Sequence, residues 1–329
     1  MTADRQDWAS TPKIELHLHL EGAAPPGFIR AEAARQGVVL PEIFRPDGGY
    51  AWRDFTEFLH VYEVASALLT SPEAYYRLTQ AVLADRLADG VIYAEIFLAP
   101  QLIGGGDPGA WAEHFAAIVE AAEAHPGIEA GWIALCVRHR GAEAAETVAR
   151  LATHTAGLCG FGMGGDERFG HPSDFARTFA IAREGGLPVT AHAGEFGGPD
   201  SVAAALDHLQ VRRIGHGVRA AEAPDLVRRL VDEEVVLEVC PGSNLALGLY
   251  SDWSAHPVAA LDRAGVKLCL STDDPPYFHT DLTSEYAALA AAHHWTRADF
   301  ARLNQVALAA AFCDEAQRGH LAKALRGEA

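Results

Sequence analysis

The sequence of 329 residues predicts an α/β fold, a (β/α)8 TIM barrel with a helical insertion after its first strand that acts as a lid. Eight β-branched or apolar runs recur along the chain, and Ala-rich amphipathic stretches follow most of them. Alternating strands and helices favour a parallel sheet, and eight such units in one chain of this length favour a closed barrel. An open, doubly wound sheet is the alternative, but no G-x-G-x-x-G motif follows an early strand.

The predicted strands are short and end at Gly, Pro or polar residues. They cover residues 14–20, 91–99, 128–137, 158–164, 187–192, 211–216, 234–240 and 266–272. Helical periodicity is expected between them, at 111–125, 142–156, 173–185, 199–209, 222–233 and 254–264. Because no low-complexity linker interrupts this pattern, we expect residues 1–329 to form a single barrel domain.

The gap between the first two strands is larger than a barrel needs. It holds a helical insertion at about residues 38–90, with helices expected at 54–69 and 72–88. The insertion leaves from the C-terminal end of the first strand, the face where barrels of this class carry their active sites. It is either a structural addition or a lid. An apolar stripe at helical spacing favours the lid and includes Phe55, Phe58 and Leu59.

Composition restricts the class of partner and the compartment. The net charge is −18, from 26 basic and 44 acidic side chains, which disfavours nucleic acid as a partner. Five Cys residues are scattered without a C-x-x-C pair, as in a protein with reduced thiols. No signal-peptide core and no apolar stretch of membrane-spanning length occurs. We therefore expect a cytoplasmic protein with a small-molecule substrate; the sequence leaves its oligomeric state open.

The first predicted strand carries an unusual polar face. Residues 14–21 alternate strictly between aliphatic and ionisable side chains, which indicates a strand with one apolar and one polar face. His17 and His19 lie two residues apart, so both imidazoles point in the same direction at close spacing. Such a pair suits two ligands of one metal ion. Taken alone, a solvated or structurally satisfied pair is an equally good interpretation.

The ends of three later strands supply further ionisable groups. His192 and Glu195 follow the fifth strand, His216 ends the sixth, and Asp273 and Asp274 end the eighth. Each alone is typical of a turn beside Gly or Pro. The carboxyl ends of all the strands of a parallel barrel meet on one face, so these side chains are expected to lie together.

This set of residues predicts a mononuclear metal site. Neutral imidazoles and a carboxylate suit a zinc-like divalent ion that keeps an open position for water. Zinc lowers the pKa of a bound water to about 7, which supplies hydroxide at neutral pH. Glu195 and His216 remain as the acid–base groups that metal-assisted hydrolysis needs. The predicted ligands of one Zn²⁺ are His17, His19, His192 and Asp273.

Taken together, the motifs resemble the adenosine deaminase family of the amidohydrolase superfamily. The resemblance covers nearly the whole chain, in order and with the spacing of a barrel. It rests on H-x-H-L-E-G at 17–22, H-A-G-E at 192–195, R-I-G-H-G at 213–217, C-P-G-S-N at 240–244 and S-T-D-D-P at 271–275.

The resemblance implies a role for each residue of the site. The four predicted ligands would bind one zinc ion, and His216 would act as base toward the zinc-bound water. Glu195 would protonate purine N1, so it must be protonated when the substrate arrives. Asp274 would contact N7, and the backbone N–H of Gly165 would face N3. The 55–62 stripe resembles the family's apolar gate over the ring.

Substrate choice turns on positions where the motifs disagree. Glu21 stands where adenosine deaminases carry an Asp that reaches toward the ribose, and Pro100-Gln101 resembles adenine deaminases. The G-G-P-D-S run after Phe196 and the Gly of R-I-G-H-G are closer to adenosine deaminases. We expect zinc-dependent hydrolytic deamination of adenosine and 2′-deoxyadenosine to inosine and ammonia, with Glu21 accepting a ribose hydroxyl. Deamination of adenine to hypoxanthine, or of another adenosine-like nucleoside, is the alternative.

Three other classes fit less well. A cytidine-type zinc deaminase needs P-C-x-x-C after its H-x-E motif, and the sequence has none. A binuclear amidohydrolase usually carries a bridging Lys at the end of strand 4, where this chain has Gly162-Met163-Gly164-Gly165. A non-catalytic binding protein on this scaffold would be expected to have lost ligands or acid–base groups, and all are present.

Overall fold

The predicted barrel is confirmed by the computed structural model, which describes residues 8–328. Eight parallel strands form one sheet in the order in which they occur along the chain. The strands are β1 (Lys13–His19), β2 (Val91–Leu98), β3 (Glu129–Val137), β4 (Leu158–Gly164), β5 (Val189–Ala193), β6 (Arg213–His216), β7 (Val236–Val239) and β8 (Lys267–Leu270). Each coincides with a predicted run to within three residues at either end.

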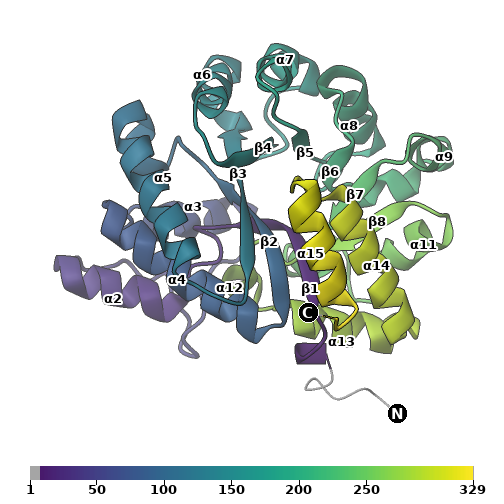
Figure 1. Ribbon diagram of the computed structural model, residues 1–329, viewed down its shortest axis with the longest axis horizontal. Coiled ribbons are helices and arrows are strands. Elements are labelled where there is room, and N and C mark those ends of the chain that lie inside the picture. Colours follow the sequence, from purple (N-terminus) through teal and green to yellow (C-terminus); the bar gives the residue numbers. More distant parts are fainter. Residues whose placement is uncertain (1–7, 329) are drawn as a thin grey trace.

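Helices surround the strands (Figure 1). Those that alternate with β2 to β8 are α5 (Pro108–Glu123), α6 (Ala142–Thr153), α7 (Ala176–Glu184), α8 (Pro199–Ala204), α9 (Pro224–Asp232), α10 (Pro241–Ala246) and α11 (Val258–Arg263). After β8 come α12 (Pro275–Phe278), α13 (Leu282–His293), α14 (Arg297–Ala310) and α15 (Glu315–Leu325). None of the helices in residues 8–328 has the length and apolar content that crossing a bilayer requires.

The barrel closes between its first and last strands just beyond the end of β8. Asp273 donates its backbone N–H to the carbonyl of His17 at 3.1 Å, and His19 donates to the carbonyl of Asp273 at 3.1 Å. The two bonds form an isolated parallel bridge between Leu18 and Asp273. This closure brings the two His residues of β1 beside the carboxylate that follows β8.

Strand alternation sorts the side chains of β1 as its pattern predicts. Ile14 and Leu16 are buried in an apolar cluster that includes Leu308 of α14. His17 faces the opposite way and meets Glu238 of β7. Because β1 and β7 are not neighbours in the sheet, these two side chains meet across the barrel interior. The apolar face of β1 therefore anchors α14, and its ionisable face lines the barrel.

Three helices lie between β1 and β2. The helices expected at 54–69 and 72–88 are α3 (Phe55–Ser66) and α4 (Pro72–Ala88), and α2 (Pro26–Gln36) precedes them. Asp54 caps α3 by accepting hydrogen bonds from two backbone N–H groups of its first turn. Ser71 caps α4, which begins with Pro72. The caps fix where each helix starts and so fix the face that α3 turns toward the barrel.

Aromatic contacts hold α3 against the C-terminal face of the barrel. The ring of Phe55 lies 4.4 Å from that of Phe196, in the loop after β5. The ring of Phe58 lies 5.1 Å from that of Phe278 in α12, which follows β8. These ring pairs place α3 over the rim where the predicted site residues collect.

Candidate active site

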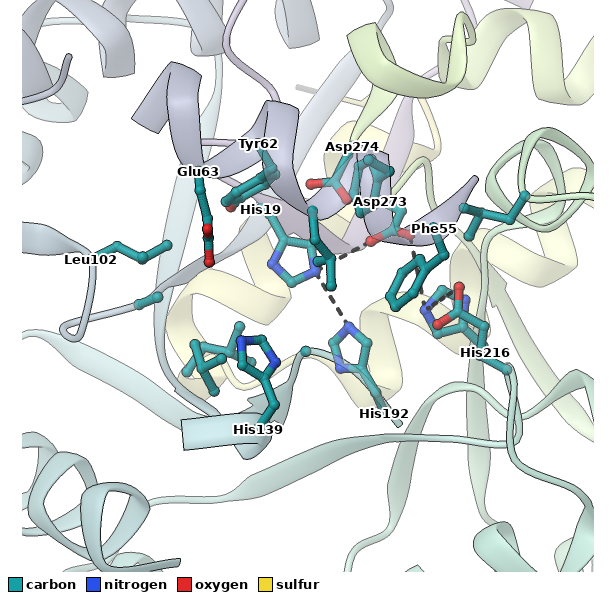
Figure 2. Close-up of a pocket in the computed structure, with 18 of the residues that line it drawn as sticks. His19, Phe55, Tyr62, Glu63, Leu102, His139, His192, His216, Asp273 and Asp274 are labelled. Atoms are coloured by element: carbon teal, nitrogen blue, oxygen red, sulfur yellow. Dashed lines mark hydrogen bonds and ion pairs between the residues drawn. The ribbon is translucent and has the colours of Figure 1, made fainter. Parts of the chain in front are cut away.

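The predicted site residues converge at the C-terminal ends of β1, β5, β6 and β8. They line a cavity of about 100 Å³ whose wall includes His19, His192, Glu195, His216 and Asp273. Figure 2 shows the imidazoles of His19, His192 and His216 turned toward Asp273 from different strands. The convergence that the strand ends predicted is therefore present in the folded chain.

Three short distances connect the four predicted metal ligands. Asp273 Oδ1 is 3.5 Å from His17 Nε2 and 3.2 Å from His19 Nε2. His192 Nε2 is 3.3 Å from His19 Nε2. Ligand atoms of His17, His192, His216 and Asp273 also lie within 4.8 Å of one another. Asp273 is thus the centre of a cluster whose nitrogen and oxygen atoms face a common point.

Hydrogen bonds outside the cluster orient its imidazoles. His192 Nδ1 is 2.8 Å from the carbonyl of Met163, which can only accept, so Nδ1 carries the proton and Nε2 has a free lone pair. His17 Nδ1 lies 2.7 Å from Glu238 Oε2 in the same way. Carboxylate and carbonyl partners of this kind commonly orient metal-binding imidazoles. Both rings therefore turn Nε2 toward the cluster.

The carboxylate behind His17 is itself held ionised. Arg213 Nε donates to Glu238 Oε1 at 2.7 Å, and Thr190 Oγ1 donates to the same oxygen at 2.8 Å. Burial opposes ionisation of Glu238, but the charge of Arg213 and the hydrogen bond with His17 bring its pKa to about 2. Glu238 had not been singled out in the sequence, because its partners come from three other strands.

A divalent cation fits these residues. His17 Nε2 is buried and has no hydrogen-bond partner, although buried polar atoms are normally paired. The unprotonated Nε2 of His192 lies only 3.3 Å from another ring nitrogen. Clustered lone pairs beside a carboxylate repel one another unless a cation lies among them. The donor set, with nitrogen and oxygen atoms and no sulfur ligand, suits zinc.

Two residues of the cluster adopt backbone conformations that are uncommon for residues other than glycine. The φ angles are 61° at His216 and 68° at Asp273. Such conformations cost free energy and are found disproportionately at functional sites. His216 is the last residue of β6, and Asp273 lies three residues beyond the end of β8. The turn at each position directs its side chain across the barrel mouth.

Glu195 and His216 face each other beside the cluster. His216 Nε2 is 3.8 Å from Glu195 Oε1 and 3.9 Å from Asp273 Oδ2. Burial raises the pKa of Glu195 well above its usual value, and the negative charges of Asp273 and Glu167 raise it further. The environment therefore favours the protonated carboxyl that a general acid at this position needs.

A carboxylate to which the sequence motifs gave no role holds the loop carrying Glu195. Glu167 Oε2 accepts hydrogen bonds from the backbone N–H groups of residues 195–197 at 2.8–3.0 Å. Its Oε1 accepts from the N–H of Gly194 at 2.6 Å and from Ser201 Oγ. Burial would raise the pKa of Glu167, but these hydrogen bonds outweigh it and lower the pKa. The position of Glu167 shortly after the fourth strand, in Gly-Gly-Asp-Glu, is the sequence feature that could have indicated a role for this residue.

Asp274 is a second buried carboxyl in the cavity wall. Its Oδ1 is buried without a hydrogen-bond partner, which leaves it free for a ligand. Burial raises its pKa well above the usual range, and the charges of Asp273 and Glu195 add to this. A Cβ atom at Gly22 would lie 1.5 Å from Asp274 Oδ1, so the glycine of the first motif makes room for this carboxyl.

The remaining wall of the cavity is largely apolar. The predicted residues Phe55, Phe58 and Leu59 of α3 all line it, and so does Gly165 at the end of β4. Gly165 has a φ of 89°, and a Cβ there would approach His139 Nδ1 to 2.8 Å. The position therefore requires glycine for both conformation and space. Figure 2 shows His139 and Glu63 on the side of the cavity away from His216.

Glu21 occupies a different place from the other predicted residues. Its side chain is only 2% exposed and does not belong to the cavity wall. Glu21 Oε1 instead accepts a hydrogen bond from the hydroxyl of Tyr75 in α4 at 3.1 Å. Burial raises the pKa of Glu21 to about 7. Tyr75, 54 residues away in sequence, gave no local signal of this pairing.

The fold and the site define a metal-dependent hydrolase built on a (β/α)8 barrel. The family model described as adenosine deaminase matches residues 12–327, so the chain belongs to the adenosine deaminase family and is an aminohydrolase of that type. Its resemblance to this family in the sequence is thereby confirmed.

Relatives within the family are more specific. An adenine deaminase from Chelativorans sp. (strain BNC1) is 46% identical over 313 residues, covering 94% of this chain and 96% of that protein. A crystal structure of adenine deaminase from Arthrobacter aurescens has a TM-score of 0.87 at 31% identity, covering 96% and 98% of the two chains. An amidohydrolase from Burkholderia ambifaria, solved with bound zinc, has a TM-score of 0.87 at 26% identity and covers 98% and 92%.

These relatives correct the expected substrate. The expectation of adenosine and 2′-deoxyadenosine, with inosine as product, is wrong, because further adenine deaminases match at 42–44% identity over nearly the full chain. The structure gives a physical reason. Glu21, which was expected to accept a ribose hydroxyl, is buried and already bonded to Tyr75. Its carboxylate therefore does not present a free acceptor to the cavity.

Proposed function

We propose that this protein hydrolytically deaminates adenine to hypoxanthine and ammonia, with one Zn²⁺ bound per chain. The observation that carries the proposal is the full-length similarity to adenine deaminases at up to 46% identity. The buried cluster of imidazoles and carboxylates supplies the chemistry that such a reaction requires. The free base is the substrate class, and no sugar or phosphate is needed for recognition.

The metal is assigned to the cluster around Asp273. His17, His19 and His192 would hold Zn²⁺ through Nε2, together with the Asp273 carboxylate. Bound zinc lowers the pKa of a water molecule to about 7. Glu238 and the carbonyl of Met163 keep two of the imidazoles in the orientation and tautomer that this ligation needs.

Glu195 supplies the proton that activates the ring. Transfer of its proton to purine N1 makes C6 electrophilic, so that the oxygen of water adds at C6. The bond from C6 to the amino nitrogen then breaks. One proton of the added water leaves with the amino group as ammonia, and the other returns to the Glu195 carboxylate, so that hypoxanthine keeps the proton on N1. The raised pKa of Glu195 supports this role, since the carboxyl must hold its proton until adenine has bound.

Groups around the cavity are assigned to the other edges of the purine. Asp274, whose raised pKa favours the protonated carboxyl, would donate a hydrogen bond to N7. The backbone N–H of Gly165, on the β4 side of the cavity, would face N3. Phe55, Phe58 and Leu59 would cover the ring and exclude bulk water, which is the lid role expected of α3.

The Glu21–Tyr75 pair supports the free base over the nucleoside. A ribose hydroxyl could bond to Glu21 only if the Tyr75 hydroxyl gave up its 3.1 Å hydrogen bond. Breaking a hydrogen bond between buried groups leaves one partner unsatisfied, at about 1–3 kcal/mol. The pair therefore lowers the benefit that a sugar would bring.

A steady-state comparison of adenine, adenosine and 2′-deoxyadenosine tests the proposal. The zinc-loaded protein is assayed with each compound by loss of the aminopurine absorbance, and metal content is measured in parallel. We expect kcat/KM for adenine to exceed that for either nucleoside by at least about 10²-fold. Equal or faster turnover of adenosine by the same preparation would overturn the assignment of the free base.

A further inference from the structure

A chain of hydrogen bonds leads away from His216 into the protein. Asn244 of α10 places its Nδ2 3.4 Å from His216 Nδ1. Asn244 Oδ1 lies 3.1 Å from His256 Nε2, and the backbone N–H of Val258 donates to His256 Nδ1 at 3.2 Å. The side chains of all three polar residues are at least 97% buried. Solvent therefore does not supply alternative partners for these atoms.

The direction of this chain is fixed at its far end. A backbone N–H only donates, so His256 Nδ1 accepts and the proton of that ring is on Nε2. Nε2–H then donates to the Asn244 carbonyl oxygen, which turns the amide N–H group toward His216. His216 Nδ1 must accept in its turn. The proton of the His216 ring is consequently on Nε2, the nitrogen that faces Glu195 and Asp273.

We propose that Asn244 and His256 are positioning residues that hold His216 with its N–H directed into the active site. The inference rests on the proposed deamination, in which an oxygen atom adds to C6 beside this ring. His216 in this tautomer donates a hydrogen bond to that oxygen. It does not begin the reaction as the base that the family resemblance implied, because Nε2 is already protonated.

The environment of His256 keeps its ring neutral within the relay, the series of hydrogen bonds from the Val258 N–H through His256 and Asn244 to His216. Burial lowers its pKa to about 3, and the nearby His293 and His216 add to this effect. Tyr250 packs edge-on against the His256 ring at 4.9 Å. At neutral pH His256 therefore has one N–H and one lone pair, as the relay requires. A second proton on His256 would displace the Val258 N–H from Nδ1.

A purely structural role would predict a different pattern of effects. Asn244 and His256 also connect the α10 turn to the segment before α11, so their loss will lower stability in either case. Only if these residues position His216 does the effect of a substitution on kcat depend on which hydrogen bonds the new side chain keeps. Asn244→Asp keeps the shape but replaces the donor with an acceptor. His256→Gln keeps an N–H at the place of Nε2, whereas His256→Leu removes it.

Steady-state kinetics on zinc-loaded variants provide the first test. We expect Asn244→Asp to lower kcat for adenine by about 10²-fold, while KM and zinc content stay within about two-fold of wild type. His256→Leu should lower kcat about as much as Asn244→Asp does, whereas His256→Gln should keep most of the wild-type kcat. If His256→Gln and His256→Leu lose kcat equally, and each also has a lower melting temperature, His256 has only a structural role and the proposal is overturned.

Nitrogen-15 NMR of the histidine rings provides a second test that needs no turnover. The ring resonances of His216 are assigned by their loss in His216→Gln. In wild type, Nδ1 should be unprotonated and Nε2 protonated, and Asn244→Asp should reverse the two. A proton on Nδ1 in wild type would overturn the proposal. This measurement is independent of substrate, so an enzyme that fails to deaminate adenine leaves the relay testable.

Discussion

The carboxylate of Glu167 offers a quantitative test of how the site is built. It is the acceptor for four successive backbone N–H groups, at residues 194–197, and for the hydroxyl of Ser201. Glu167→Ala removes all of these acceptor interactions at once. The loop that carries Glu195 would lose its anchor while the predicted metal ligands remain. We therefore expect catalysis to fail before metal binding does.

The size of the effect follows from the count of unsatisfied groups. Each buried N–H left without a partner costs about 1–3 kcal/mol. The hydrogen bonds of Gly194 and Glu195 to Glu167 are buried, and those of Phe196 and Gly197 are partly buried, so losing all four should displace the loop from its native position. Displacing a catalytic group by about 1 Å lowers the rate by about 10²-fold, and we expect at least this loss in kcat. Glu167→Gln keeps one oxygen. Placed at the Oε2 position, that oxygen still accepts from the N–H groups of residues 195–197.

A graded series makes the test specific. Ser201→Ala removes a single hydrogen bond, worth about 1 kcal/mol, and serves as the matched control. The three variants are compared by kcat and KM with adenine, by zinc content and by urea unfolding. Activity should fall in the order Ser201→Ala, Glu167→Gln, Glu167→Ala. If Glu167→Ala keeps kcat within a few-fold of wild type, the loop does not depend on this carboxylate and the argument fails.

Four further predictions concern the site and its surroundings. His19→Ala should lose bound zinc by elemental analysis; full zinc occupancy would remove His19 from the ligand set. Glu195→Gln should keep zinc yet lower kcat by about 10²–10⁴-fold, and a nearly active variant would exclude Glu195 as the acid. Gly22→Ala would place a Cβ atom 1.5 Å from Asp274 Oδ1, so KM for adenine should rise while zinc content is unchanged. The pKa of His256 is about 3 in the folded protein and about 6.5 in the unfolded chain. The contribution of the neutral His256 ring to the free energy of unfolding is therefore complete above pH 6.5 and declines as the pH falls toward 3. The shift corresponds to roughly 5 kcal/mol at 1.4 kcal/mol per pH unit, and urea unfolding of His256→Gln should show a weaker loss of stability over this window.

Much of the site is predictable because it follows local periodicity. Alternation along β1 places His17 and His19 on one face, and that rule needs no knowledge of the rest of the chain. Parallel strands of a barrel end on the same face, so the residues after β5, β6 and β8 had to meet there. The closing bridge between Leu18 and Asp273 then brings the first and last of these groups into contact.

The tertiary structure decided which of these side chains is available to a substrate. Glu21 has the right spacing to face the barrel mouth, yet its carboxylate is bonded to Tyr75 of α4. That contact depends on how the insertion packs against β1, which periodicity does not describe. The expectation of a nucleoside substrate failed at Glu21, because the availability of its carboxylate depends on Tyr75, which is distant in the sequence.

By itself, the sequence determined the barrel and the meeting of its ionisable side chains at the barrel mouth, because strand spacing and strand ends control both. Only the folded chain revealed the hydrogen bonds of Glu167 to the Glu195 loop and those that connect Asn244 and His256 with His216. These residues act through hydrogen bonds with atoms 12 to 34 positions away in sequence. Buried polar groups must find partners wherever packing brings them together, and no local pattern states which partner that will be.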